Sequence, residues 1–148
     1  MNIDNEVEIE ADAAAVWPVF TDVARWPEWT HSVIEATDLD SPGIDLGNRF
    51  AIRQPRLPRL VWEVTEVTPG RSWAWRSHSF AADSTATHEL APAAAPGRTL
   101  VRQRLELRGP LGVLTAVLRR RLMRRYLDME AAGLKRRVEQ LPGSAATA

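Results

Sequence analysis

Two polar side chains, His88 and Gln103, fall among apolar residues on two successive segments that alternate between apolar and polar positions. A hairpin register that pairs Leu90 with Val101 also pairs His88 with Gln103, and it keeps both on one apolar face. Buried polar groups need hydrogen-bond partners. We consider three interpretations: the two side chains satisfy each other, with or without a water molecule; they bind the hydroxyl or carbonyl group of a ligand; or His88 takes part in catalysis.

The other residues capable of chemistry form no recognised catalytic or metal-binding motif. His31, His78 and His88 lack the spacing of metal ligands, and the sequence contains no H-E-x-x-H motif, phosphate loop or nucleophile elbow. Alternation places His78 on the wet face of its strand, and a bulge would turn Glu66 outward. The chain has no cysteine, which excludes disulfides and thiolate nucleophiles. We therefore expect neither a metal ion nor a cofactor.

Tryptophan is the most abundant aromatic residue, with six copies against one tyrosine. Trp62, Trp73 and Trp75 fall on the predicted dry face of a sheet, where aromatic rings either pack the core or line a pocket. Both interpretations stay open at this point.

Five arginines lie close together between positions 119 and 125. The simplest interpretation is a solvated helix face. Alternatively, Arg121 and Arg125 reach the acidic head group of a ligand at the mouth of a pocket, because long basic side chains extend beyond the apolar surface that they cover.

These residues must be positioned by an antiparallel sheet, two short helices and one long helix. Strands are predicted over residues 6–10, 33–38, 48–54, 60–67, 72–80, 85–90 and 99–108. Asp12 is the predicted cap of a first helix that continues to a break at Trp26, before Pro27. A long helix is predicted over residues 111–141, with its buried stripe at Leu114, Leu118, Leu122, Tyr126, Met129 and Gly133.

The order of these elements predicts an α+β fold in which a curved antiparallel sheet wraps around the long C-terminal helix. A sheet with one dry face must cover that face, and only this helix is large enough to do so. We expect one domain over residues 1–141 and a frayed tail over residues 142–148. On this helix phase, Leu118→Asp would unfold the protein.

Charge is balanced overall but is distributed unevenly along the chain. Residues 1–48 contain 11 acids and one base, while residues 49–148 contain 18 bases and 8 acids. The two segments then either face each other or lie on opposite surfaces. With a net charge of zero, we expect no nucleic-acid partner. The sequence shows no signal peptide and no stretch long enough for stable membrane insertion, so we expect a cytoplasmic protein, either a monomer or a homodimer.

Several short motifs resemble those of the SRPBCC superfamily, which includes START-like lipid-transfer domains, the birch-pollen allergen and polyketide aromatase/cyclases. They are Val16-Trp17, Asp22, Trp26-Pro27-Glu28-Trp29, Gly47, Phe50, Trp62-Glu63-Val64, Pro69-Gly70 and Gly109-Pro110-Leu111-Gly112. The resemblance covers nearly the whole chain and implies the helix-grip fold with two short helices near the N-terminus and an internal ligand cavity. It does not by itself imply a reaction.

Two features of the aromatase/cyclases differ in this sequence. Those enzymes carry a pocket tyrosine a few residues after the Trp-Pro pair, where this chain has Thr30-His31-Ser32-Val33. They also use a pocket arginine, whereas Arg49 and Arg53 are predicted to point outward.

The sequence therefore favours binding of a small hydrophobic or amphipathic molecule, as in a carrier, a sensor or a lipid-binding protein. The alternatives are a polyketide cyclase/dehydratase-like enzyme and a structural protein whose cavity is only a packing defect. The predicted ligand-binding residues are Phe50, Ile52, Trp62, Val64, Trp73, Trp75, His88, Gln103, Leu114, Leu118, Leu122 and Tyr126. The ligand itself is not predicted.

Overall fold

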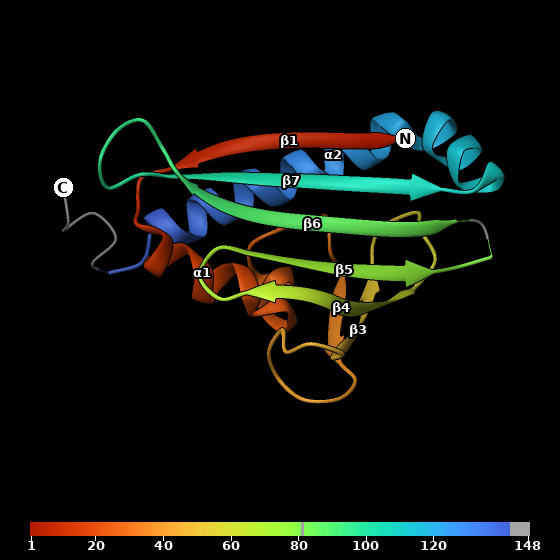
Figure 1. The fold of residues 1–148 in the computed structure, drawn as a ribbon, viewed down its shortest axis with the longest axis horizontal. Helices are drawn as coiled ribbons and strands as arrows, with labels where there is room; N and C mark the ends of the chain where they lie inside the picture. Colours follow the sequence, from red (N-terminus) through yellow and green to blue (C-terminus); the bar gives the residue numbers. More distant parts are fainter. Residues whose placement is uncertain (81, 143–148) are drawn as a thin grey trace.

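The alternating segments form a seven-stranded antiparallel sheet in the computed structural model, which describes residues 1–80 and 82–142 (Figure 1). The strands are β1 (Asn2–Ile9), β2 (Glu35–Asp38), β3 (Arg49–Arg53), β4 (Leu60–Thr68), β5 (Ser72–His78), β6 (Asp83–Pro92) and β7 (Thr99–Arg108). Their order in the sheet is β1-β7-β6-β5-β4-β3-β2. The predicted α+β helix-grip fold is confirmed. Most of the predicted frayed tail, residues 143–148, lies outside the described residues.

The β6–β7 hairpin has the predicted register. His88 is paired with Gln103, Leu90 with Val101 and Ala86 with Leu105. His88 and Gln103 are both buried, so two polar side chains do lie side by side on the dry face. On β4, the register shifts between Val64 and Glu66, and this bulge leaves Glu66 exposed.

The first helix, α1 (Ala13–Thr21), ends earlier than predicted. The break falls at Asp22, and the 3₁₀ helix η1 (Val23–Glu28) runs through the Trp26-Pro27 pair. The reason is a hydrogen bond of 3.0 Å that the buried Trp26 indole donates to the Phe20 carbonyl. Carbonyls in the last turn of a helix lack intrahelical donors, so this bond stabilises the corner between the two helices.

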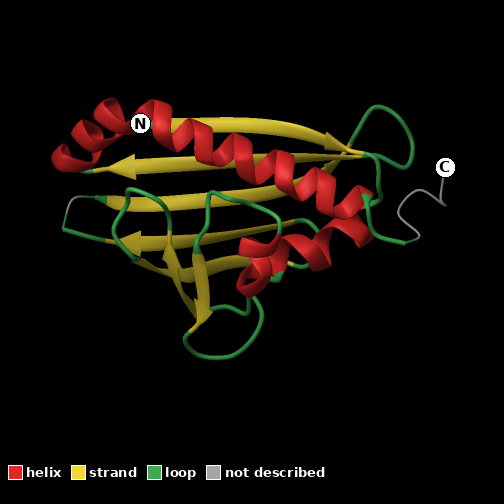
Figure 2. Ribbon diagram, turned by 180° about the vertical axis from the view of Figure 1, so that it is seen from behind, coloured by secondary structure: helices red, strands yellow, loops and turns green. Residues whose placement is uncertain are grey.

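The long helix α2 (Pro110–Glu139) crosses the concave face of the sheet, and Figure 2 shows this face. Its C-terminal half is packed against the protein: Tyr126, Glu130, Leu134 and Val138 are buried. Its first two turns begin beyond the end of β7 and leave most of their apolar side chains exposed.

The predicted stripe of this helix is buried at Tyr126 and Gly133, but its N-terminal half is wrong. Leu114 and Leu118 are 52% and 75% exposed, and Leu122 is only partly buried. The rotation of α2 is set at Gly133, where a Cβ atom would lie 2.1 Å from the Trp29 carbonyl oxygen. This close approach turns Glu130 toward the sheet. The predicted stripe was chosen from apolar residues and therefore left out Glu130. As a result, its N-terminal half lies on a different side of the helix from the buried residues.

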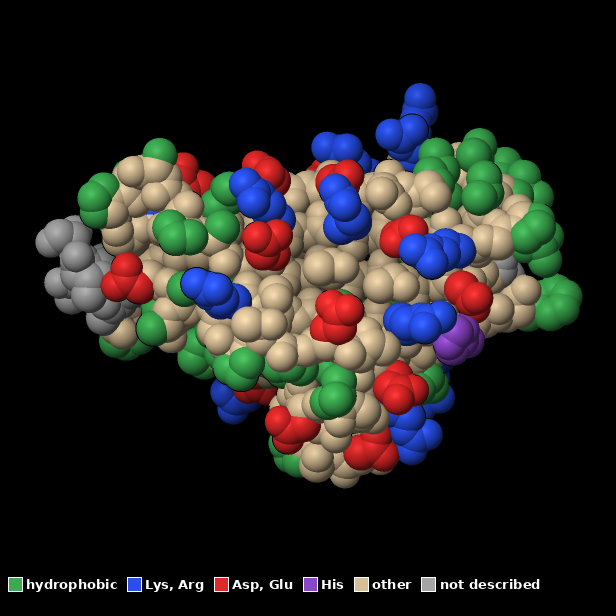
Figure 3. Space-filling model, in the orientation of Figure 1, with side chains coloured by type: hydrophobic (Ala, Val, Ile, Leu, Met, Phe, Trp, Pro, Cys, Tyr) green, Lys and Arg blue, Asp and Glu red, His purple; other side chains and the backbone are tan. Residues whose placement is uncertain are grey.

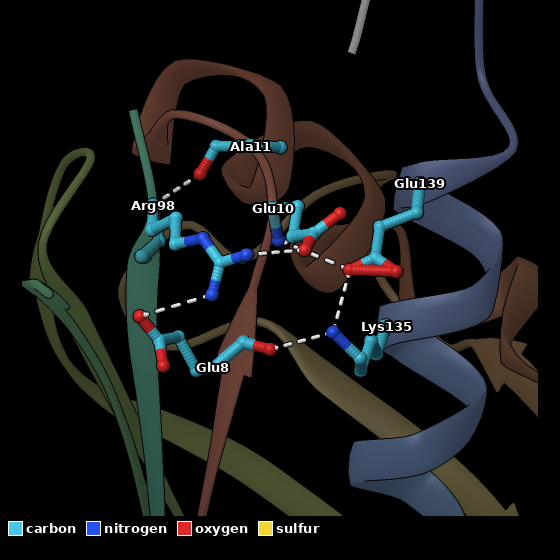
Figure 4. Close-up of polar contacts among 7 residues, drawn as sticks. Glu8, Glu10, Ala11, Arg98, Lys135 and Glu139 are labelled. Carbon is cyan, nitrogen blue, oxygen red and sulfur yellow. Dashed lines mark hydrogen bonds and ion pairs between the residues drawn. The ribbon is translucent and has the colours of Figure 1, made fainter. Parts of the chain in front are cut away.

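A polar network attaches the C-terminal half of α2 to the N-terminal strand (Figure 4). Lys135 Nζ donates to the Glu8 carbonyl at 2.8 Å and to Glu139 at 2.7 Å. Glu139 accepts the backbone N–H of Glu10 at 3.0 Å, and the Glu10 carboxylate pairs with Arg98. No comparable network is observed at the N-terminal end of α2 within the described residues.

The acidic segment and the basic segment face each other on the outer side of the sheet. Asp4 accepts a hydrogen bond from Arg104 at 2.6 Å, and Glu6 accepts one from Arg102 at 3.0 Å. The antiparallel pairing of β1 with β7 brings these residues opposite each other. Exposed ion pairs of this kind each contribute about 0–1 kcal/mol. They therefore fix the register of β1 more than they stabilise the fold.

We expect two leucines of α2 to respond very differently to truncation. Leu134 is 0% exposed, so Leu134→Ala should lower the free energy of unfolding by about 2–5 kcal/mol. Leu118→Ala, the matched control on the same helix, should change it by less than about 0.5 kcal/mol. Urea unfolding followed by circular dichroism measures both values. Equal losses in the two variants would contradict the observed helix phase.

Candidate functional site

A cavity of about 100 Å³ lies between the concave face of the sheet and α2. Its walls are mainly apolar and aromatic, with four polar or acidic side chains among them: Gln54, Ser84, His88 and Glu130. The lining residues are Trp26, Val33, Ile52, Gln54, Leu57, Leu60, Trp62, Trp75, Ser84, Ala86, His88, Leu105, Leu107, Met123, Tyr126, Leu127 and Glu130. An apolar cavity with a few convergent polar groups is the usual composition of a small-molecule site.

His88 lies among aromatic rings at this cavity. Its imidazole stacks on Trp73 with the ring centroids 3.9 Å apart and the planes 10° from parallel. The rings of Phe20, Trp26 and Trp75 surround it edge-on, at centroid distances between 5.2 and 6.2 Å. The register of β5 with β6 causes the stacking, because it pairs Trp73 directly with His88.

This aromatic environment keeps His88 uncharged. Burial lowers the pKa of His88 to about 3, and the hydrogen bond with the Trp73 carbonyl opposes only part of that change. In the neutral ring, Nδ1–H donates to that carbonyl at 3.3 Å. The remaining nitrogen, Nε2, then carries a lone pair and is an acceptor.

Glu130 supplies the second polar group of the cavity wall. It projects from α2 and is buried, and its Oε1 accepts a hydrogen bond of 2.5 Å from Gln103 Nε2. Burial raises the pKa of Glu130 to about 8, although the Gln103 contact acts in the opposite direction. The carboxyl group is therefore protonated at pH 7. Its second oxygen carries the proton and is a hydrogen-bond donor.

His88 and Glu130 thus give the cavity wall one acceptor and one donor, both uncharged, in addition to the polar side chains of Gln54 and Ser84. Gln103 lies between His88 and Glu130 in the structure, since it is paired with His88 across the strands and bonded to Glu130. Its own Oε1 has no partner among the described residues. The interpretation that His88 and Gln103 satisfy each other by a direct hydrogen bond is therefore wrong: Gln103 bonds to Glu130, and His88 bonds to a backbone carbonyl.

The outer side of the cavity is closed by the loop between β3 and β4, residues 54–59. Two contacts attach this loop to α2. The Tyr126 hydroxyl donates to the Pro55 carbonyl, and Arg119 Nη1 donates to the Arg56 carbonyl at 3.2 Å. Leu57 from the loop and Met123 from the helix complete the wall.

The structure brings only some of the predicted site residues to the cavity. Ile52, Trp62, Trp75, His88 and Tyr126 lie on its wall. A second group is buried nearby without lining it: Phe50, Val64, Trp73 and Gln103. A third group, Leu114, Leu118 and Leu122, lies on the part of α2 that leaves the sheet, so it does not form the wall.

The residue that the sequence prediction missed is Glu130. Tyr126, Glu130, Leu134 and Val138 follow one another at four-residue steps on α2. A single carboxylate within an otherwise buried stripe was the available signal. Gln54 and Leu57 were also omitted, because they lie in the β3–β4 loop, where no periodic pattern indicates direction. The remaining omitted wall residues lie on helices and strands, for example Ala86 on β6, Leu105 on β7 and Met123 on α2.

Comparison of this chain with known protein families gives a match that covers nearly all of it. The family described as "Polyketide cyclase / dehydrase and lipid transport" matches residues 1–139. The chain belongs to this family. No curated protein matches the sequence significantly. None of the helices formed by the described residues combines the length and apolar character needed to span a membrane.

Solved structures share the fold of this polyketide cyclase/dehydrase and lipid-transport family member at low sequence identity. A hypothetical protein from Helicobacter pylori has a TM-score of 0.78 and 16% identity, over 93% of this chain and 88% of that chain. A START superfamily protein from Mycobacterium smegmatis has a TM-score of 0.72 and 19% identity, over 94% and 97%. The di-domain ARO/CYC BexL from the BE-7585A biosynthetic pathway has a TM-score of 0.71 and 18% identity, over 97% and 48%. The predicted superfamily is thereby confirmed.

The two buried groups predict a specific dependence of stability on pH. Between pH 4.5 and pH 8, the folded state holds a proton on Glu130 that the unfolded state has released, so Glu130 makes stability fall as the pH rises. Between pH 3 and pH 6.5, the unfolded state holds a proton on His88 that the folded state lacks, so His88 makes stability rise with pH. The two effects oppose each other between pH 4.5 and pH 6.5, and only that of Glu130 remains above pH 6.5.

We therefore expect Glu130→Gln to reduce the loss of stability between pH 6.5 and pH 8. The difference in slope between wild type and variant should approach about 1.4 kcal/mol per pH unit, the value for one proton. Urea unfolding at a series of pH values measures it, and Glu63→Gln, an exposed carboxylate on β4, is the matched control. If the wild type and Glu130→Gln show the same slope, the Glu130 carboxyl is not held neutral.

Proposed function

We propose that this protein binds a small, uncharged, mainly apolar molecule that carries a hydroxyl or carbonyl group, as a carrier or sensor. The observation that carries the proposal is the pair of neutral polar groups in an apolar cavity. Glu130 offers a donor, and His88 offers an acceptor. A hydroxyl group can satisfy both, and a carbonyl group can satisfy Glu130.

The absence of charge at the cavity supports a neutral ligand. Neither ionisable wall residue is charged at pH 7, so a buried ionic group on the ligand would find no counter-ion there. Desolvating such a group without a partner costs several kcal/mol.

The reducing conditions of the cytoplasm suit this cysteine-free chain, and we propose that the protein acts there.

The cavity is smaller than most ligand sites, so a ligand can enter only if part of the wall moves. Small-molecule sites usually enclose about 300–1,000 Å³, whereas this cavity encloses about 100 Å³. A ligand of ordinary size must therefore displace the β3–β4 loop or Met123. The two hydrogen bonds that hold the loop are the contacts that would have to open.

Binding can be tested with prodan, an uncharged naphthalene that carries a ketone. We expect its emission to shift to shorter wavelength on binding and to accept energy from Trp62 and Trp75 on the cavity wall. Glu130→Ala should weaken binding by about 1–3 kcal/mol, because the ketone loses its donor. His78→Ala, a histidine exposed on β5, is the control and should leave the affinity unchanged.

Two further measurements define the outcome. Native mass spectrometry of freshly purified protein should detect any molecule that has been retained. The same naphthalene core bearing a sulfonate should bind more weakly than prodan, because the cavity contains no counter-ion. The binding proposal is wrong if prodan fails to bind and no retained species is found.

A second candidate function is catalysis of the polyketide cyclase/dehydratase kind, and one observation favours it. The pKa of Glu130, raised to about 8 by burial, lies near neutral pH, where a general acid is most effective. Glu130 could protonate a keto oxygen while an enol carbon of the same substrate adds to that carbonyl carbon, and the proton released from the enol hydroxyl would return to the Glu130 carboxylate. Burial lowers the pKa of His88 to about 3, which is far from neutral pH, so His88 is a poor general base.

The catalytic candidate predicts turnover as well as binding. A linear poly-keto substrate incubated with the protein should give a cyclised product that has lost water, detected by mass spectrometry. Glu130→Gln should abolish this product while retaining most of the affinity, because an amide still donates a hydrogen bond but transfers no proton. Binding without turnover in the wild type would leave the carrier or sensor as the function.

A further inference from the structure

The first two turns of α2 expose a concentration of apolar side chains at one end of the molecule. Together with a nearby aromatic ring they form what we call the apolar tip: Phe80, Leu111, Val113, Leu114, Val117 and Leu118. Phe80 is 97% exposed and Leu118 is 75% exposed. Figure 3 shows hydrophobic side chains gathered at the end where β7 leads into α2. Contiguous exposed apolar surface on a protein usually marks an interaction site.

A basic segment follows the apolar tip directly on the same helix. We call it the basic collar: Arg119, Arg120, Arg121, Arg124 and Arg125. Residues 107–127 contain no acidic side chain. Four of the collar arginines line an open groove of about 730 Å³ on α2, together with His31, Asp128 and Arg136.

The collar differs from the other arginines of the protein in its pairing. The arginines of β7 are paired with acids of β1, as described above. Arg120, Arg121, Arg124 and Arg125 form no ion pair with any residue in the part of the chain that the structure describes. Arg119 donates only to a backbone carbonyl. Apart from Arg119, the collar is therefore positive charge that no acidic side chain of the described residues neutralises.

The tip and the collar are arranged one after the other along the helix axis. Leu114 and Arg121 lie on the same exposed side, two turns apart, which corresponds to about 10 Å at 1.5 Å per residue. Peripheral helices bury apolar side chains about 5–10 Å into the boundary between head groups and acyl chains. When α2 enters end-on, with its axis along the membrane normal, and the tip is inserted to that depth, the collar lies at the level of the lipid phosphates.

We propose that the N-terminal half of α2 docks this protein on a membrane surface rich in anionic lipids. The apolar tip enters the acyl boundary, and the basic collar pairs with lipid phosphates. The anchored C-terminal half of α2 keeps the rest of the protein fixed relative to this surface. The proposal goes beyond ligand binding, because it needs neither the cavity nor its polar pair.

Other occupants of this surface fit less well. In a symmetric dimer, the same patch would face itself and bring two basic collars together without counter-charges. Nucleic acid would pair with the arginines but would leave the large apolar tip in contact with polar surface. A bilayer with anionic head groups complements both parts at once.

Vesicle co-sedimentation tests the proposal with the full-length chain. We expect the wild type to sediment with vesicles of phosphatidylcholine and phosphatidylserine, and only weakly with vesicles of phosphatidylcholine alone. Leu114→Glu/Leu118→Glu should lower the partition coefficient at least tenfold on both kinds of vesicle. Arg120→Ala/Arg121→Ala/Arg124→Ala should lower it about a hundredfold on the anionic vesicles.

Matched variants control for general effects of the substitutions. Leu46→Glu replaces a leucine that is 71% exposed in the β2–β3 loop, and Arg71→Ala replaces an exposed arginine in the β4–β5 turn. Both should sediment like the wild type. Because the substituted tip and collar side chains are exposed, every variant should keep the wild-type melting temperature and the wild-type affinity for prodan.

The outcomes separate this proposal from the others. Failure of the wild type to sediment with anionic vesicles would overturn docking, whatever happens to prodan. Light scattering that shows a dimer, lost in Leu114→Glu/Leu118→Glu, together with no vesicle binding, would identify the patch as an interface between copies. Loss of prodan binding with vesicle binding intact would overturn the proposed function and leave docking standing.

Discussion

The close approach of Gly133 to the backbone of Trp29 determines how α2 lies over the sheet. No side chain larger than hydrogen fits there, since a Cβ atom would lie 2.1 Å from the Trp29 carbonyl oxygen. The contact fixes the rotation of the helix, and rotation decides which side chains enter the interior. Tyr126, Glu130 and Leu134 are turned inward, and Leu114 is turned outward. The cavity wall and the exposed apolar tip both follow from this one contact.

Burial then changes the chemistry of the two ionisable groups on the cavity wall. Transfer out of water disfavours the charged form of any group, so burial raises the pKa of the Glu130 carboxyl and lowers the pKa of the His88 imidazole. The same physical effect acts on an acid and a base and leaves both neutral. The result is a donor and an acceptor in an apolar space, without the cost of a buried ion pair.

Charge is used differently on the two sides of the molecule. On the outer face of the sheet, the acids of β1 lie opposite the arginines of β7, because the two strands are antiparallel neighbours. The arginines of the basic collar have no ion-pair partner in the part of the chain that the structure describes, since the helix leaves the sheet at that end. The acidic N-terminal segment therefore neutralises the arginines on the outer face of the sheet. Four arginines of the basic collar are not neutralised and line a positively charged groove on α2.

The sequence by itself determined the seven strands, the register of the β6–β7 hairpin and the resemblance to the family. Period-two alternation is a local property, because each side chain points to the face opposite its neighbours, and so His88 opposite Gln103 could be predicted. The rotation of α2 was not determined in this way. Apolar residues occur on several sides of that helix, and only contact with Trp29 selects the buried one. The place of Glu130 on the cavity wall was therefore decided by tertiary structure alone, because burial of a charged residue type depends on the neighbours that the fold places around it.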